Sequence, residues 1–188
     1  MKSRISLGPG FVRTRSAKVR ELNMKRLSMI GIFGLMLTCS ASVFAQKPDF
    51  NGSWAMDRAR SFGLPGNMNQ TMMVTQTAAE MTVETRLIQP GNERTVKDSY
   101  VLDGKEHDFT PQVPPGQPVP KGKRTAAWMP GGNGLLITNV TTTESPKGPV
   151  TTQDVRKWTI INGELVIAQY VDNPNVSYEA KRIFKRNP

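Results

Sequence analysis

Short runs of alternating apolar and polar residues dominate the chain from residue 46 onward. Met81, Val83 and Leu87 share one face of such a run, and Glu84 and Arg86 share the other. A period of two residues is typical of β-strands that have one buried and one solvated face. We therefore predict strands at residues 51–57, 69–76, 80–88, 94–102, 123–129, 134–143, 150–161, 164–171 and 176–186.

Turn-forming residues separate these runs. Asn162-Gly163 is the clearest turn, because both residues tolerate the positive φ of a type I′ hairpin. Similar clusters of Gly, Pro, Asn and Ser lie at 89–92, 130–134 and 145–149. Short connections throughout predict an all-β antiparallel meander. Closing it into an up-and-down barrel of about 8–9 strands removes the exposed edges, and a two-layer β-sandwich is the alternative.

The segment from Asp103 to Lys123 interrupts this rhythm. It contains five prolines, whose nitrogens cannot donate hydrogen bonds to a sheet. We therefore predict an extended loop over these residues. A loop of this length is either a functional lid or a solvated connector.

An apolar segment at residues 29–37 follows the basic residues 24–26 and precedes small residues that end at Ala45. This order predicts a secretory signal peptide at 24–45, cleaved after Ala45. An uncleaved N-terminal anchor is the alternative, although the apolar run is shorter than the roughly 20 residues of a membrane span.

Residues 1–23 are basic and lack apolar periodicity. They are either an upstream extension, with translation starting at Met24, or an unusually long basic region of the signal. Cleavage leaves residues 46–188 as a single domain, which we expect to be periplasmic or secreted. A domain of about 140 residues buries a core without disulfides, and Cys39, the only cysteine, lies within the signal segment.

The distribution of charge changes what the basic composition implies. The net charge of +10 by itself would favour a nucleic-acid or anionic-membrane partner. Residues 1–45 carry eight Lys or Arg and one acid, so 17 basic and 14 acidic residues remain in the predicted mature domain. We therefore expect no nucleic-acid partner, and no stable membrane insertion after the signal is removed.

Residues suited to catalysis or metal binding are sparse in the predicted domain. His107 is the only histidine, and it stands between two acids beside the proline-rich segment. A zinc site without cysteine and with one histidine would depend on carboxylates. No nucleophile elbow, phosphate loop or dinucleotide fingerprint is present. We predict no enzyme, metal or cofactor, and a barrel enzyme with a polar site around His107 is the third hypothesis.

The tripeptide Gly52-Ser53-Trp54 opens the first predicted strand. A Gly-x-Trp at this place in a β-meander resembles the lipocalin and fatty-acid-binding-protein group of calycin barrels. The fatty-acid-binding proteins insert two helices after the first strand, whereas residues 58–68 contain two glycines and a proline. The plain lipocalin-like barrel therefore fits better.

The order of later motifs is similar to that of exported bacterial lipocalin-like proteins. The stretch from Tyr100 to Gly104 matches a Tyr-x-x-Asp-Gly motif, and Trp128 and Trp158 follow on two later strands. The resemblance covers residues 49–188.

This resemblance implies structural roles for Gly52 and Trp54. The indole would close one end of the barrel and pack against a basic side chain of the last strand. Arg182 and Arg186 are the two candidates there, and we assign the structural role to Arg182, which lies on the apolar face with Tyr178 and Phe184. The alternative is that Arg182 points to solvent.

The resemblance also implies a cup that holds a small hydrophobic ligand such as a lipid. The protein would then be an exported binding protein. The inward positions predicted to bind the ligand are Met72, Val74, Met81, Val83, Trp128, Ile137, Trp158, Ile160, Ile167 and Tyr178. If side chains fill the barrel, the same residues form ordinary core. The alternative is then a non-enzymatic interaction or structural module.

Overall fold

The computed structural model describes residues 46–63, 66–113, 116–146 and 148–187. The predicted upstream extension and signal peptide, residues 1–45, lie outside the described residues. Within the described part of the chain, no helix is long and apolar enough to span a membrane.

The described residues form ten β-strands and one short 3-10 turn, Arg58–Arg60. The strands are β1 (Gly52–Met56), β2 (Asn69–Gln76), β3 (Glu80–Gln89), β4 (Asn92–Val101), β5 (Glu106–Phe109), β6 (Lys121–Trp128), β7 (Leu135–Thr143), β8 (Val150–Ile161), β9 (Glu164–Asn173) and β10 (Val176–Arg186). The predicted all-β fold is confirmed, and each of the nine predicted strands corresponds to an observed one.

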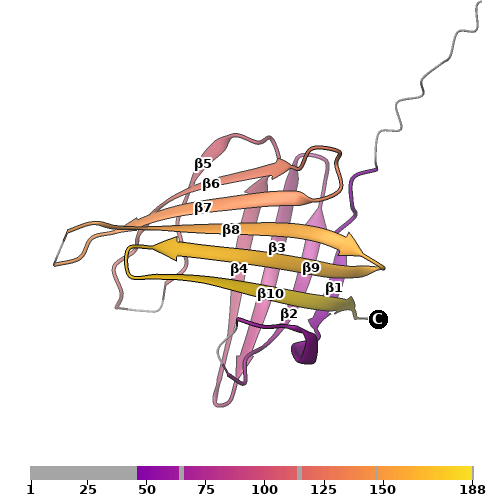
Figure 1. The fold of residues 1–188 in the computed structure, drawn as a ribbon, viewed down its shortest axis with the longest axis horizontal. Coiled ribbons are helices and arrows are strands. Elements are labelled where there is room, and N and C mark those ends of the chain that lie inside the picture. Colours follow the sequence, from indigo (N-terminus) through magenta and orange to yellow (C-terminus); the bar gives the residue numbers. More distant parts are fainter. Residues whose placement is uncertain (1–45, 64–65, 114–115, 147, 188) are drawn as a thin grey trace, which may run out of the picture. The chain divides into compact units, whose positions relative to one another are not determined.

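All ten strands belong to one antiparallel sheet in the order β4-β3-β2-β1-β10-β9-β8-β7-β6-β5. Consecutive strands pair as hairpins except β4 and β5, and β1 pairs with β10, which joins the first strand to the last. The sheet wraps into a nearly closed up-and-down barrel (Figure 1). The two-layer sandwich is therefore not the fold, and the barrel has more strands than predicted.

The barrel has one seam, because β4 and β5 follow each other in sequence without pairing. The prediction that residues 103–123 form only a loop is wrong at β5, which pairs with residues 122–125 of β6. Strand β5 precedes Pro111, so it donates its backbone hydrogen bonds freely. Its four residues are too short to show a clear alternation of apolar and polar positions.

Aromatic side chains fill one end of the barrel. Phe50 stacks on Trp128 with centroids 6.2 Å apart and meets the edge of Trp158 at 5.8 Å. Phe184 of the last strand is fully buried in the same cluster. This packing closes the end of the barrel at which the chain enters β1.

Trp54 lies fully buried within this closed end. Its Nε1 donates a hydrogen bond to the carbonyl of Phe50 at 2.8 Å. The guanidinium of Arg186 lies over the indole, 4.6 Å from the ring centroid. The basic side chain that covers Trp54 is therefore that of Arg186 and not of Arg182, because Trp54 pairs directly with Arg186 across β1 and β10.

Gly52 adopts a φ of +117°, and a Cβ at this position would lie 2.9 Å from Nη1 of Arg186. We expect Gly52→Ala to lower the free energy of unfolding by about 1–3 kcal/mol, because left-handed backbone strain adds to the displacement of Arg186. Urea denaturation measures the effect. Gly91→Ala is the matched control, since Gly91 has a φ of +73° in open space. An equal loss in both variants would contradict the role of Arg186.

Candidate functional site

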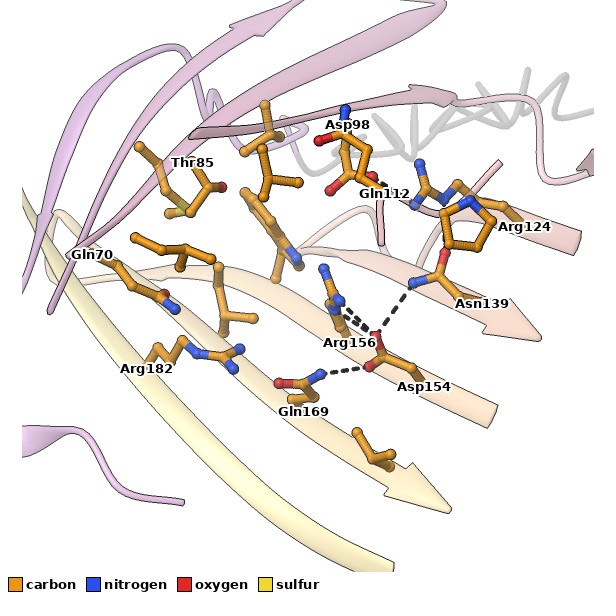
Figure 2. A pocket seen from close by; sticks show the side chains of 18 of the residues that line it. Gln70, Thr85, Asp98, Gln112, Arg124, Asn139, Asp154, Arg156, Gln169 and Arg182 are labelled. Carbon is orange, nitrogen blue, oxygen red and sulfur yellow. Dashed lines mark hydrogen bonds and ion pairs between the residues drawn. The ribbon is translucent and has the colours of Figure 1, made fainter. Parts of the chain in front are cut away.

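A cavity of about 900 Å³ occupies the barrel beyond the aromatic end. Strands β2, β3 and β4 line it with mostly apolar side chains, among them Met72, Val83, Leu87 and Val96. Strands β6 to β9 line it with a row of polar and charged residues (Figure 2). A cavity of this size is within the range of small-molecule sites in proteins.

The ten predicted ligand-binding residues divide into two groups of five. Those that line the cavity are Met72, Val83, Trp158, Ile167 and Tyr178. Those that pack in the filled part of the barrel are Val74, Met81, Trp128, Ile137 and Ile160. The interior therefore has a packed end and a hollow end. Met72, Val83, Trp158 and Ile167 also belong to the hydrophobic core cluster, and ligand binding by the ten residues stays a prediction.

Arg124 of β6 links the two edges of the barrel seam. Its Nη2 forms an ion pair with Asp98 of β4 at 2.8 Å, and its Nη1 donates to the carbonyl of Ser99 at 2.9 Å. The guanidinium also lies over the rings of Tyr100 and Phe109, 4.4 and 4.0 Å from their centroids. One buried side chain thus joins β6 to β4 where backbone pairing is missing.

The proline-rich segment also contacts this seam. Gln112 donates from Nε2 to the carbonyl of Lys97 on β4 at 3.2 Å. Pro111 and Gln112 line the cavity together. Pro111 and Gln112 therefore form part of the cavity wall. The lid hypothesis for the proline-rich segment requires such contact with the site.

Asp154 of β8 is the centre of the polar network (Figure 2). Arg156 donates to its Oδ2 from Nε at 2.9 Å and from Nη2 at 2.6 Å. Gln169 of β9 donates from Nε2 to Oδ1 at 2.8 Å. Asn139 of β7 donates to Oδ2 at 3.4 Å and accepts from Nε of Arg124 at 2.7 Å. The network therefore extends from β4 to β9 along the cavity wall.

These polar residues were not among the predicted site residues, although the sequence contains a signal for them. They occupy the same alternating positions as the apolar residues that were chosen. Arg156 precedes Trp158 by two residues, and Gln169 follows Ile167 by two. Restricting the inward positions to apolar side chains excluded them.

Arg182 of β10 lines the cavity without a partner of opposite charge. Its guanidinium forms no hydrogen bond or ion pair with another described residue, and its Nε is buried. Burial, followed by the positive charge of Arg156, lowers the pKa of Arg182 to about 10. The side chain remains charged at neutral pH.

The strand register explains why Arg182 is isolated. It pairs with Ile167 of β9, which pairs in turn with Trp158 of β8. The neighbours across the sheet on both strands are thus apolar. The two interior carboxylates, Asp98 and Asp154, are already bound to Arg124 and Arg156.

Two further polar atoms of the cavity wall are buried without partners among the described residues. They are Nε1 of Trp158, a donor, and Oε1 of Gln169, an acceptor. Buried polar groups in proteins are nearly always hydrogen-bonded. Their position next to a free arginine indicates a site that binds a polar group.

His107 makes no hydrogen bond to this network among the described residues, but it lines a second, smaller pocket together with Asp98 and Arg124. It contacts Asp103 at 3.0 Å, and both side chains are exposed to solvent. No group of three or more metal-ligating side chains occurs in the described ranges.

No protein-family model matches the chain, and no curated protein matches it in sequence. The chain is similar to several solved structures. A zebrafish ileal bile acid-binding protein, complexed with cholic acid, has a TM-score of 0.49 and 18% identity, covering 73% of this chain and 98% of that one.

A heat-soluble SAHS protein from Ramazzottius varieornatus has a TM-score of 0.47 and 16% identity, with 73% and 95% of the two chains covered. A fatty-acid-binding protein from Manduca sexta has a TM-score of 0.41 and 16% identity, with 73% and 99% covered. Similarities at this level assign neither a family nor a ligand, so the function is inferred from the cavity itself.

Proposed function

We propose that this protein binds a small amphipathic molecule with a single anionic group. The observation that carries the proposal is Arg182, an unpaired cation in the wall of a cavity of about 900 Å³. Arg182 is half-buried, with its Nε enclosed by the protein, and a charge partly removed from water without a partner is costly to a folded protein. A ligand with the opposite charge forms an ion pair with Arg182, and the removal of the unfavourable charge contributes to the free energy of binding.

Arg182 is the interior cation that can bind an anionic group. Arg124 and Arg156 each have their own aspartate, and two other charged side chains of the wall, Arg94 and Glu179, are exposed to solvent. The apolar side chains of β2 to β4 suit a hydrocarbon body for the same molecule. Trp158 Nε1 adds a free donor on the same wall.

Replacing Arg182 with methionine tests the proposal. We expect Arg182→Met to weaken the binding of dodecanoate by about 10- to 100-fold, because charge-assisted hydrogen bonds are strong in a buried site. Binding of dodecanol, which has the same chain and no charge, should not weaken. Isothermal titration calorimetry measures both.

Lys157→Met is the matched control, since Lys157 lies exposed on the outer face of β8. It should bind dodecanoate as the unmodified protein does. The free protein with Arg182→Met should unfold at no lower urea concentration, because the substitution removes an uncompensated charge. Equal affinity for dodecanoate and dodecanol in the unmodified protein would overturn the proposal.

We further propose that the protein works in the periplasm or after secretion. The support is the order of basic, apolar and small residues at 24–45. N-terminal sequencing of the protein recovered from its own cells would then begin at Gln46. A sequence beginning at Met1 or Met24 would contradict export by cleavage.

A further inference from the structure

The carboxamide of Gln169 has only one workable orientation. Its Nε2 donates to Oδ1 of Asp154 at 2.8 Å, and an ionised carboxylate can only accept hydrogen bonds. The reverse orientation would place two oxygens against each other. Asp154 is itself held by Arg156, so the oxygen of Gln169 is kept pointing away from it.

That oxygen is a buried acceptor without a donor. Oε1 of Gln169 has no hydrogen-bond partner among the described residues, and Gln169 lines the cavity. Arg156 donates to Asp154 from Nε and Nη2, and Asn139 donates to the same carboxylate, so these donors are engaged elsewhere. A buried acceptor left unpaired costs about 1–3 kcal/mol.

Gln169 is a close neighbour of Arg182 on the cavity wall. Gln169 pairs with Ala180, and Ile167 pairs with Arg182, in the register between β9 and β10. The two polar residues are therefore diagonal neighbours on one face of the sheet, about 7–8 Å apart at the backbone. Figure 2 shows both side chains on the same wall of the cavity. When the anionic group of a ligand binds Arg182, a second ligand group a few bonds away can therefore reach the oxygen of Gln169.

We propose that the ligand is an amphipathic anion that carries a hydroxyl or amide N–H donor a few bonds from its anionic group. The anionic group binds Arg182, and the donor binds Oε1 of Gln169. This inference rests on the proposed function for the position of the anionic group. Gln169 is then the residue that selects among amphipathic anions, and Asp154 is the positioning residue that orients it.

Three acids of equal chain length test this inference on the unmodified protein. They are dodecanoic acid, 3-hydroxydodecanoic acid and 12-hydroxydodecanoic acid. We expect the 3-hydroxy acid to bind up to about tenfold more tightly than dodecanoic acid, the effect of one net hydrogen bond. The 12-hydroxy acid, whose hydroxyl lies at the far end of the chain, should bind no more tightly than dodecanoic acid.

Gln169→Leu removes the acceptor while the ion pair between Asp154 and Arg156 remains. We expect it to abolish the preference for the 3-hydroxy acid and to leave the affinity for dodecanoic acid within about twofold, since the lost bond contributes to one ligand only. Titration calorimetry gives the affinities, and circular dichroism confirms that the variant is folded.

The outcomes separate this inference from the proposed function. Equal affinity for the three acids, with dodecanol binding more weakly, would overturn the role of Gln169 and leave the anion site at Arg182. If dodecanol binds as tightly as the acids, or if none of the probes binds, the anion site fails and this inference fails with it. A preference for the 3-hydroxy acid that survives in Gln169→Leu would also overturn it.

Discussion

Replacing Trp54 with alanine should lower the free energy of unfolding by about 3–5 kcal/mol, the cost of deleting a large buried aromatic side chain. Trp54 is fully buried, and its removal leaves a cavity at the closed end of the barrel. The carbonyl of Phe50 also loses its donor, and Arg186 loses the ring over which it lies. Urea denaturation followed by far-ultraviolet circular dichroism measures the change.

Trp54→Phe is the matched control for this result. Phenylalanine keeps an aromatic surface beneath Arg186 and removes the donor to Phe50, so the loss should be smaller than with alanine. A loss below about 1 kcal/mol for Trp54→Ala is typical of surface substitutions. That result would contradict the closed end described above.

Replacing Asp154 with asparagine should lower the free energy of unfolding by about 1–3 kcal/mol, because it leaves Arg156, a half-buried cation, without its carboxylate. Arg156 would face the cavity wall without its carboxylate. The new amide must also accommodate Gln169 and Asn139, both of which donate to Asp154 in the native protein. Urea denaturation at neutral pH measures the effect.

Two controls identify the cause of that loss. Adding Arg156→Met to Asp154→Asn removes the stranded charge and should recover part of the stability. Asp108→Asn alters an exposed ion pair with Lys123, 2.8 Å long, and should cost at most about 1 kcal/mol. Similar losses for Asp108→Asn and Asp154→Asn would show that the interior network contributes no more than a surface pair.

The fold was largely predictable because strand alternation is a local signal. Met81 and Val83 are buried on one side of β3, and the Asn162-Gly163 turn joins β8 to β9. The seam was not predictable, because it depends on which strands fail to pair. Arg124 crosses from β6 to β4 over a separation of 26 residues, and no spacing in the sequence indicates that contact.

The site was predictable in part. Alternation placed Trp158, Ile167 and Arg182 on the inner face, and all three line the cavity. It did not separate the packed end of the barrel from the hollow end. It also did not show which of Arg182 and Arg186 covers Trp54, because both positions have the same parity along β10 and only the register between β1 and β10 distinguishes them.

By itself, the sequence determined an all-β meander, its turns and the inward face of each strand, since backbone sterics and burial act over a few neighbouring residues. Only the tertiary structure decided how the interior charges pair. Asp98 reaches Arg124, Asp154 reaches Arg156, and Arg182 is left with neither. The pair of Asp98 and Arg124 spans the seam between β4 and β6, so it exists only once the strands are in register, whereas Asp154 and Arg156 lie two residues apart on β8.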